Sequence, residues 1–254
     1  MKEKFISGIY NYCDRWCERC AFTSRCRSYE STGKLSTEQT DIDNKAFWDT
    51  VSNNFQNAIS LLHKIAEEQG IDLNNIPPEE TARYEADRLR IKSAAKKHIL
   101  SILCKEYREL VMPFLEERLN SNLISKTKEL SSQLHMGIKT EEEVVHTMAA
   151  LGNYAEIIRW YLFFIDAKLQ RALHGSMEDA EDNDGYPKDS DGSAKVAIIA
   201  VERSIAAWSG IYEQMPEEED IMLPVLSLLS RIRNEAMKTF PAAMQFKRPG
   251  FDDE

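Results

Sequence analysis

Apolar residues recur at steps of three and four along almost the whole of this 254-residue chain. A clear example is the series Phe47, Val51, Phe55, Ile59 and Leu62, which falls on one face of an α-helix. The sequence lacks alternating apolar runs between turn residues, which are the pattern typical of strands. We therefore expect an all-α protein, an antiparallel bundle of about six to seven helices with an N-terminal cysteine-rich metal-binding segment.

Capping residues, glycines and prolines indicate where these helices begin and end. Thr140 and Glu143 match a capping box, in which the side chain at each position satisfies an N–H of the other. Pro113 is expected to kink or divide a long helix, because proline lacks an N–H and clashes with the preceding turn. The expected helices span residues 3–18, 45–70, 77–119, 124–134, 140–173, 194–215 and 216–240.

Shifts in composition predict two parts of the chain. Residues 1–40 are expected to form a helix that carries the cysteine segment, followed by a polar linker, and residues 41–245 the helical bundle. Within the bundle, the acidic residues near 176–192, which include glycine and proline, are expected to form a mobile surface loop.

Four of the five cysteines lie in one short stretch with the spacing C-x3-C-x2-C-x5-C: Cys13, Cys17, Cys20 and Cys26. An ordinary helical core would accommodate the first three on one face, but it leaves Cys26 unexplained. Clustered thiols in a reducing compartment are typical of metal ligands. We therefore expect these four cysteines to bind a metal ion or an iron–sulfur cluster.

Four arginines surround the same cysteines, against only two acidic residues, in a chain whose net charge is −10. Four thiolates leave a bound centre with net negative charge, which nearby cations would stabilise. The arginines expected to play this part are Arg15, Arg19, Arg25 and Arg27.

The segment from Cys17 to Cys26, with Phe22 two residues after the third cysteine, resembles the C-x2-C-x5-C run of RecB-type nucleases. In that family the run binds a [4Fe–4S] cluster together with a distant upstream cysteine. The resemblance covers about ten residues and implies cluster ligands only. The carboxylates and lysine of those nucleases lie on strands, which this sequence does not indicate.

Two further resemblances concern the same segment. Cys13, Cys17 and Cys20 satisfy the C-x3-C-x2-C motif of radical S-adenosylmethionine enzymes, but Arg19 replaces the aromatic residue before the third cysteine. An all-helical chain also lacks the βα barrel of those enzymes. The complete segment is similar to the opening of a set of uncharacterised bacterial proteins, and that resemblance implies no activity.

The arrangement of the ligands bears on the choice of metal. Structural zinc sites usually join two separated C-x2-C pairs, whereas cluster-binding loops carry their cysteines in one segment, as this chain does. We therefore expect a [4Fe–4S] cofactor, with zinc as the alternative. The expected function is electron transfer or redox sensing with a protein redox partner. The alternative is a zinc-stabilised helical module that binds an unknown protein.

Other features limit the function classes. The net charge of −10 argues against nucleic acid as a partner. No run approaches the roughly 18 apolar residues of a membrane span, and the first residues do not match a signal peptide. We expect a cytoplasmic protein, where thiols stay reduced. The sequence contains neither a P-loop nor a nucleophile elbow, two motifs that would indicate a class of enzyme.

Two further sets of residues leave open a second site. Glu143 and His146 form a Glu-x-x-His half-motif, of which di-iron carboxylate bundles need a second copy. Asp166 and Glu202 are charges within apolar helical segments and need cationic partners if they are buried. The candidate partners are Arg159 and Arg203.

Overall fold

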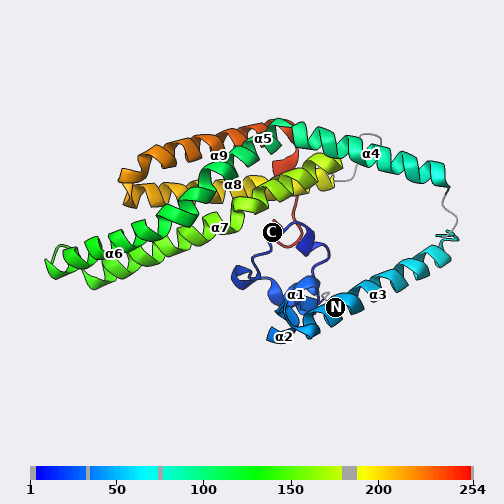
Figure 1. The fold of residues 1–254 in the computed structure, drawn as a ribbon, viewed down its shortest axis with the longest axis horizontal. Coiled ribbons are helices and arrows are strands. Elements are labelled where there is room, and N and C mark those ends of the chain that lie inside the picture. The colour runs from blue at the N-terminus through cyan, green and yellow to red at the C-terminus, as the bar shows by residue number, and fades with distance from the viewer. Residues whose placement is uncertain (1–3, 33–34, 74–76, 179–187, 253–254) are drawn as a thin grey trace. The chain divides into compact units, whose positions relative to one another are not determined.

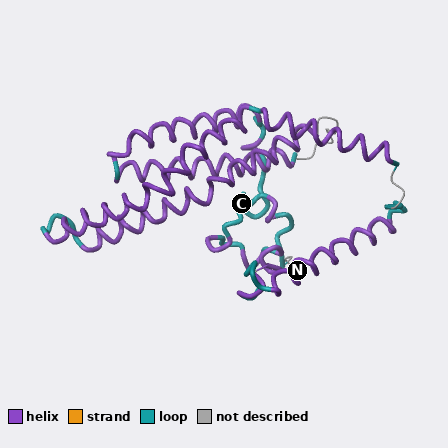
Figure 2. Tube along the Cα trace, viewed as in Figure 1, coloured by secondary structure: helices purple, strands orange, loops and turns teal. Residues whose placement is uncertain are grey.

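A computed structural model gives the structure of residues 4–32, 35–73, 77–178 and 188–252. These residues form helices, short 3-10 turns and loops, and none of them forms a strand (Figure 2). The expected all-α fold class is therefore confirmed. The chain divides into two compact units, one made of Met1–Arg90 with Pro249–Glu254 and the other of Ile91–Arg248.

The second unit is a helical bundle in which α5, α7, α8 and α9 pack side by side and α6 lies along α7 (Figure 1). A π-helical turn, Phe114–Arg118, joins α5 to α6, and a 3-10 turn, Pro216–Glu218, precedes α9. The helices of this unit are the end of α4 (Pro78–Lys97), α5 (Ile99–Pro113), α6 (Leu119–His135), α7 (Glu141–Glu178), α8 (Asp189–Gln214) and α9 (Glu219–Thr239).

Large aromatic side chains fill the centre of this bundle. Trp208 is completely buried on α8, and its Nε1–H donates to the hydroxyl of Tyr107 on α5 at 3.1 Å. The Phe114 ring lies 5.5 Å from the Trp208 ring. Burying aromatic rings with their polar atoms paired stabilises a core without leaving an unsatisfied donor.

The first unit combines the early part of the chain with the segment Pro249–Phe251. Its regular elements are mostly short, apart from one long amphipathic helix. They are the 3-10 turns Ile9–Asn11, Cys17–Arg19 and Thr23–Arg25, the helices α1 (Arg27–Thr32), α2 (Thr37–Thr40) and α3 (Lys45–Glu68), and the first part of α4.

The expected helix over residues 3–18 is wrong. Gly8 and Arg15 both have left-handed backbones, with φ of 72° and 60°, and an α-helix cannot continue through either residue. The Asp14 side chain accepts the N–H of Trp16 at 3.2 Å, a local turn that competes with helical hydrogen bonding. The cysteines therefore lie on a series of turns and not along one helical face.

The division of the expected helix over 77–119 falls at His98 and not at Pro113. His98 has an extended backbone, and its Nδ1 accepts the N–H of Leu100 at 3.2 Å, so it caps α5. Pro113 is the last residue of α5, and the chain continues through the π-helical turn directly into α6. A π turn carries one more residue per hydrogen-bonded turn than an α-helix.

Both ends of the acidic segment near 176–192, which was expected to form a loop, are helical. Helix α7 continues to Glu178 and α8 begins at Asp189, while residues 179–187 lie outside the described residues. Asp189 and Asp191 stand in the first turn of α8, where the helix dipole favours anions, and Asp189 pairs with Arg171 of α7 at 2.8 Å. The boundary between the units also differs from the expected one, because it falls at Arg90 and not near residue 40.

Among the residues that the structure describes, we find no helix that combines the length and the apolar character needed to cross a bilayer.

Candidate metal centre

The four-cysteine segment is a loop built from tight turns. The N–H of Ile6 donates to the carbonyl of Arg25 at 3.0 Å, which ties the two ends of the segment together. Within it, the N–H of Cys20 donates to the carbonyl of Cys17 at 3.1 Å, and that of Cys26 to Thr23 at 3.2 Å. Each of these bonds closes a 3-10 turn, so the backbone reverses repeatedly and brings cysteines that are far apart on an extended chain into one region.

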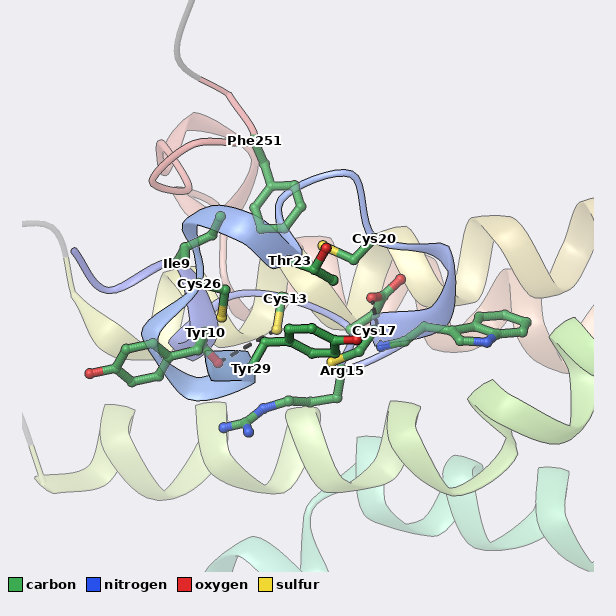
Figure 3. Close-up of a pocket in the computed structure, with 12 residues that line it drawn as sticks. Ile9, Tyr10, Cys13, Arg15, Cys17, Cys20, Thr23, Cys26, Tyr29 and Phe251 are labelled. Atoms are coloured by element: carbon green, nitrogen blue, oxygen red, sulfur yellow. Dashed lines mark hydrogen bonds between the residues drawn. The ribbon is translucent and has the colours of Figure 1, made fainter. Parts of the chain in front are cut away.

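All four cysteines line a single pocket of the first unit, and each is partly exposed. Figure 3 shows their sulfur atoms with the rings of Tyr10, Tyr29 and Phe251 around the same pocket. The walls also include Ile9, which is 2% exposed, and Trp16. The structure thus brings together the four residues that the sequence predicts as ligands.

The sulfur atoms make hydrogen bonds with the backbone of the loop. The N–H of Phe22 donates to Sγ of Cys20 at 3.4 Å, and the thiol of Cys13 donates to the carbonyl of Tyr10 at 3.6 Å. Backbone N–H groups that donate to cysteine sulfur are a common second shell of thiolate-bound centres, because they stabilise the negative charge on sulfur.

Electrostatics inside the pocket oppose charge on the Cys17 thiol when no cation is present. Burial, followed by the proximity of Cys13, Glu18, Cys20 and Cys26, raises the pKa of the Cys17 thiol. A metal cation at the same place would reverse this balance, because a coordinated thiol loses its proton.

The four arginines are placed unequally. Arg15 lines the pocket, and the guanidinium of Arg19 lies 4.0 Å from the ring centroid of Trp16, a pocket residue. Arg27 stacks over Phe5 at 5.5 Å, and Phe5 is not among the pocket residues. Arg25 is exposed and contributes its backbone carbonyl to the bond with Ile6. Of the four arginines, Arg15 is the one that lines the pocket, and Arg19 contacts it through the ring of Trp16.

The fit of a metal depends on how closely the ligands converge. Within the described ranges, no three His, Cys, Asp or Glu side chains are grouped so that they hold one metal ion. A tetrahedral zinc places each sulfur about 2.3 Å from a common point. In a [4Fe–4S] cluster each thiolate binds a different iron atom, so the sulfurs surround a larger volume. The two kinds of centre therefore require different separations of the four sulfur atoms.

The candidate second-site residues have other partners. The carboxylate of Glu143 accepts the N–H of Thr140 at 2.7 Å and its hydroxyl at 3.0 Å, which confirms the capping box and lowers the pKa of Glu143. Asp166 pairs with Arg108, and Glu202 with Arg233 at 2.8 Å. The expected partners, Arg159 and Arg203, were therefore wrong; Arg203 donates to the hydroxyl of Tyr161 at 2.6 Å instead.

The sequence did not reveal the aromatic part of the pocket that comes from the far end of the chain. Phe251 lines the pocket, and its ring meets the Phe22 ring edge to face, with centroids 5.1 Å apart. The neighbouring Gly250 has a φ of +77°, a conformation that glycine adopts readily, but a glycine in the sequence does not indicate which residues such a turn approaches.

Comparison with known proteins finds no matching family model, no matching curated protein and no matching solved structure.

Proposed function

We propose that the first unit binds a [4Fe–4S] cluster through Cys13, Cys17, Cys20 and Cys26, and that the protein serves in electron transfer or redox sensing. The observation that carries this proposal is the single pocket lined by all four cysteines. The placement of all four cysteines in one short segment, as in cluster-binding loops, favours a cluster over a single ion.

The chemistry follows from the number of ligands. A bound cluster would supply one-electron exchange at a potential set by its charge, its hydrogen bonds and its exposure. Four thiolates occupy all four irons, so the protein groups bind and shield the centre and leave no position for a substrate. The bond from the Phe22 N–H to Cys20 stabilises charge on that sulfur. Electrons would pass to a protein partner, which we place with this protein in the cytoplasm.

A zinc-stabilised interaction module is the second candidate, and one observation favours it. The enclosed part of the pocket measures about 20 Å³, little more than the space that one water molecule needs. A single ion fills such a space with less rearrangement than a cluster. In that case the metal would hold the turns of the first unit together, and the function would lie in binding another protein.

Metal and sulfide analysis of protein purified without oxygen separates these proposals. We expect about four irons and four acid-labile sulfides per chain, a brown colour with absorbance near about 400 nm, and bleaching on reduction with dithionite. The iron and sulfide content should fall in each of the four single variants Cys13→Ser, Cys17→Ser, Cys20→Ser and Cys26→Ser. Cys104→Ser is the matched control, because Cys104 is buried in the second unit.

A colourless protein with about one zinc per chain and no sulfide would refute the cluster and support the zinc module. A protein that holds neither metal, and whose stability does not change in the quadruple serine variant, would refute both.

A further inference from the structure

The segment Pro249–Asp252, which we call the strap, belongs to the same unit as the cysteine segment although about 220 residues separate the two in the sequence. The strap is separated from the cysteines by the whole second unit along the chain, yet Phe251 is one of the residues around the cysteine pocket (Figure 3). Because the pocket is lined by segments that are distant in the sequence, the strap must be held in one place to be part of the lining.

Contacts at Phe251 and Gly250 help to hold the strap. The ring of Phe251 meets the ring of Phe22 edge to face at 5.1 Å, and Phe22 lies between the ligands Cys20 and Cys26. Gly250 adopts φ of +77° and packs so tightly that an added Cβ would lie 2.8 Å from Cδ1 of Ile6 and 3.1 Å from Cδ1 of Ile9. Only glycine fits this position without displacing the backbone or its neighbours.

The place of Phe251 also matters chemically. The pocket is lined by thiols that are partly exposed, and the ring of Phe251 belongs to the same lining. Solvent access is one of the factors that set the potential of a thiolate-bound cluster and the rate at which its ligands are lost. An aromatic ring in this lining takes up space that water and small molecules would otherwise fill beside the ligands.

We propose that the strap covers the cysteine pocket and that Phe251 is the positioning residue that shields the metal ligands from solvent. The shielding of a bound centre rests on the proposed function. The cover itself is a property of the polypeptide, so it is tested without any metal.

The test is thiol alkylation of the full chain after removal of metal, with iodoacetamide and peptide mass spectrometry to measure the rate at each cysteine. In Phe251→Ala the rates at Cys13, Cys17, Cys20 and Cys26 should rise about two- to tenfold, the change expected from losing one edge-to-face ring contact. Gly250→Ala should give the same increase by displacing the strap backbone. Phe251→Tyr keeps the ring, so the alkylation rates at the four cysteines should stay at their wild-type values.

Two references make the result specific. Cys104 lies in the second unit at 2% exposure, and its rate should stay unchanged in every strap variant. Phe55→Ala removes a phenylalanine of the first unit that is 66% exposed, and should leave the rates at the four pocket cysteines as they are.

Equal rates in wild type, Phe251→Ala and Gly250→Ala would overturn the strap. So would a parallel rise at Cys104, because this would indicate general unfolding. The metal-loaded protein gives a separate readout: loss of the centre to a chelator should be faster in Phe251→Ala than in Phe55→Ala. If the protein holds no metal but the alkylation rates change as described, the proposed function fails and the strap stands.

Discussion

Arg15 has the least favourable backbone among the residues that line the cysteine pocket. Its φ is 60°, and in the described residues it is the one non-glycine with a positive φ. The conformation brings a Cβ close to the following carbonyl and costs about 1 kcal/mol or more. Strain of this kind persists when the surrounding structure requires it, and here it lies between two metal-ligand candidates, Cys13 and Cys17.

Substitution at Arg15 separates the backbone from the charge. Arg15→Gly should relieve the strain, whereas Arg15→Val keeps a Cβ and adds β-branching, so it should be less stable than Arg15→Gly by about 1–2 kcal/mol. Both variants remove the same charge, which makes each the control for the other. Urea unfolding of the metal-free protein measures the difference, and equal stabilities would contradict a strained Arg15.

At the scale of elements, α7 shows how caps and close packing decide where a helix lies. Its N-terminus is held by Thr140 and Glu143, whose side chains exchange hydrogen bonds with the backbone of the other residue. Farther along, the ring of Tyr154 lies directly over Gly210 of α8, where there is no space for a Cβ. A local signal specifies the first feature, whereas the second depends on a contact between two helices.

Loss of the cap should be measurable by its pH dependence. Thr140→Ala should lower the free energy of unfolding of the second unit by about 1 kcal/mol. Glu143→Gln should also destabilise at pH 7. Because the hydrogen bonds from Thr140 lower the pKa of Glu143, its stabilisation is present above the unfolded value of about 4.3 and is lost as the pH falls through the lower folded value.

The deficit of Glu143→Gln should therefore shrink below about pH 4 and be absent in stronger acid. Glu142→Gln is the matched control, because it removes a carboxylate from the same helical turn and keeps the Thr140–Glu143 pair. A deficit that is constant with pH, or equal for both glutamine variants, would show that the bond to Thr140 is not its cause. Denaturant unfolding at several pH values provides the measurement.

A pair of glycines tests the contact between α7 and α8. Gly210→Ala should lower the stability of the bundle by about 1–3 kcal/mol, because the new methyl group overlaps the ring of Tyr154. Gly152→Ala should raise it by about 0.5–1 kcal/mol, since no atom lies within 4 Å of its added Cβ and alanine favours a helix. Urea unfolding measures the change in stability of each variant. If both variants change the stability in the same direction, the packing of Tyr154 on Gly210 is contradicted.

The same distinction between local and distant contacts explains what the sequence predicted. Helical periodicity identified the all-α class, and the Thr140–Glu143 pattern identified a cap, because both depend on residues within a few positions. Apolar spacing did not distinguish a helix over residues 3–18 from successive 3-10 turns, although Gly8 and Asp14 were signals against a helix.

Partners that are distant in sequence were the main source of error. Asp166 pairs with Arg108, 58 positions away, and Glu202 with Arg233, 31 positions away, so the expected partners close in sequence were wrong. The four cysteines were predictable as a group, because a spacing of a few residues limits how far they can separate. Phe251 was not, because nothing in the sequence indicates which residues return to the first unit.

For the whole molecule, the division into two units separates the candidate metal ligands from the bundle. The candidate ligands all lie in the first unit, whereas the large buried aromatic cluster lies in the second. Within the first unit, the cysteine segment is built from short turns, which have few internal contacts to replace the contribution of a metal. For small metal domains the free energy of binding is largely free energy of folding.

Removal of the metal should therefore loosen one unit and not the other. Hydrogen exchange followed by mass spectrometry should show rates at least about tenfold higher in peptides from residues 4–32 after chelation. Peptides from α7, α8 and α9 should be unchanged. The quadruple serine variant should match the chelated protein, and Cys104→Ser should match the untreated one. Equal loss of protection in both units would contradict this separation.

The strap has a consequence for how the protein is made. A ribosome adds about 5–20 residues per second. All of Ile91–Arg248 is synthesised after Arg90 of the first unit and before Phe251 of the same unit. For at least about 8 seconds the nascent chain therefore exposes its cysteines without their aromatic cover. Delivery of a metal or cluster during translation would meet an open site, and the arrival of the strap would then close it.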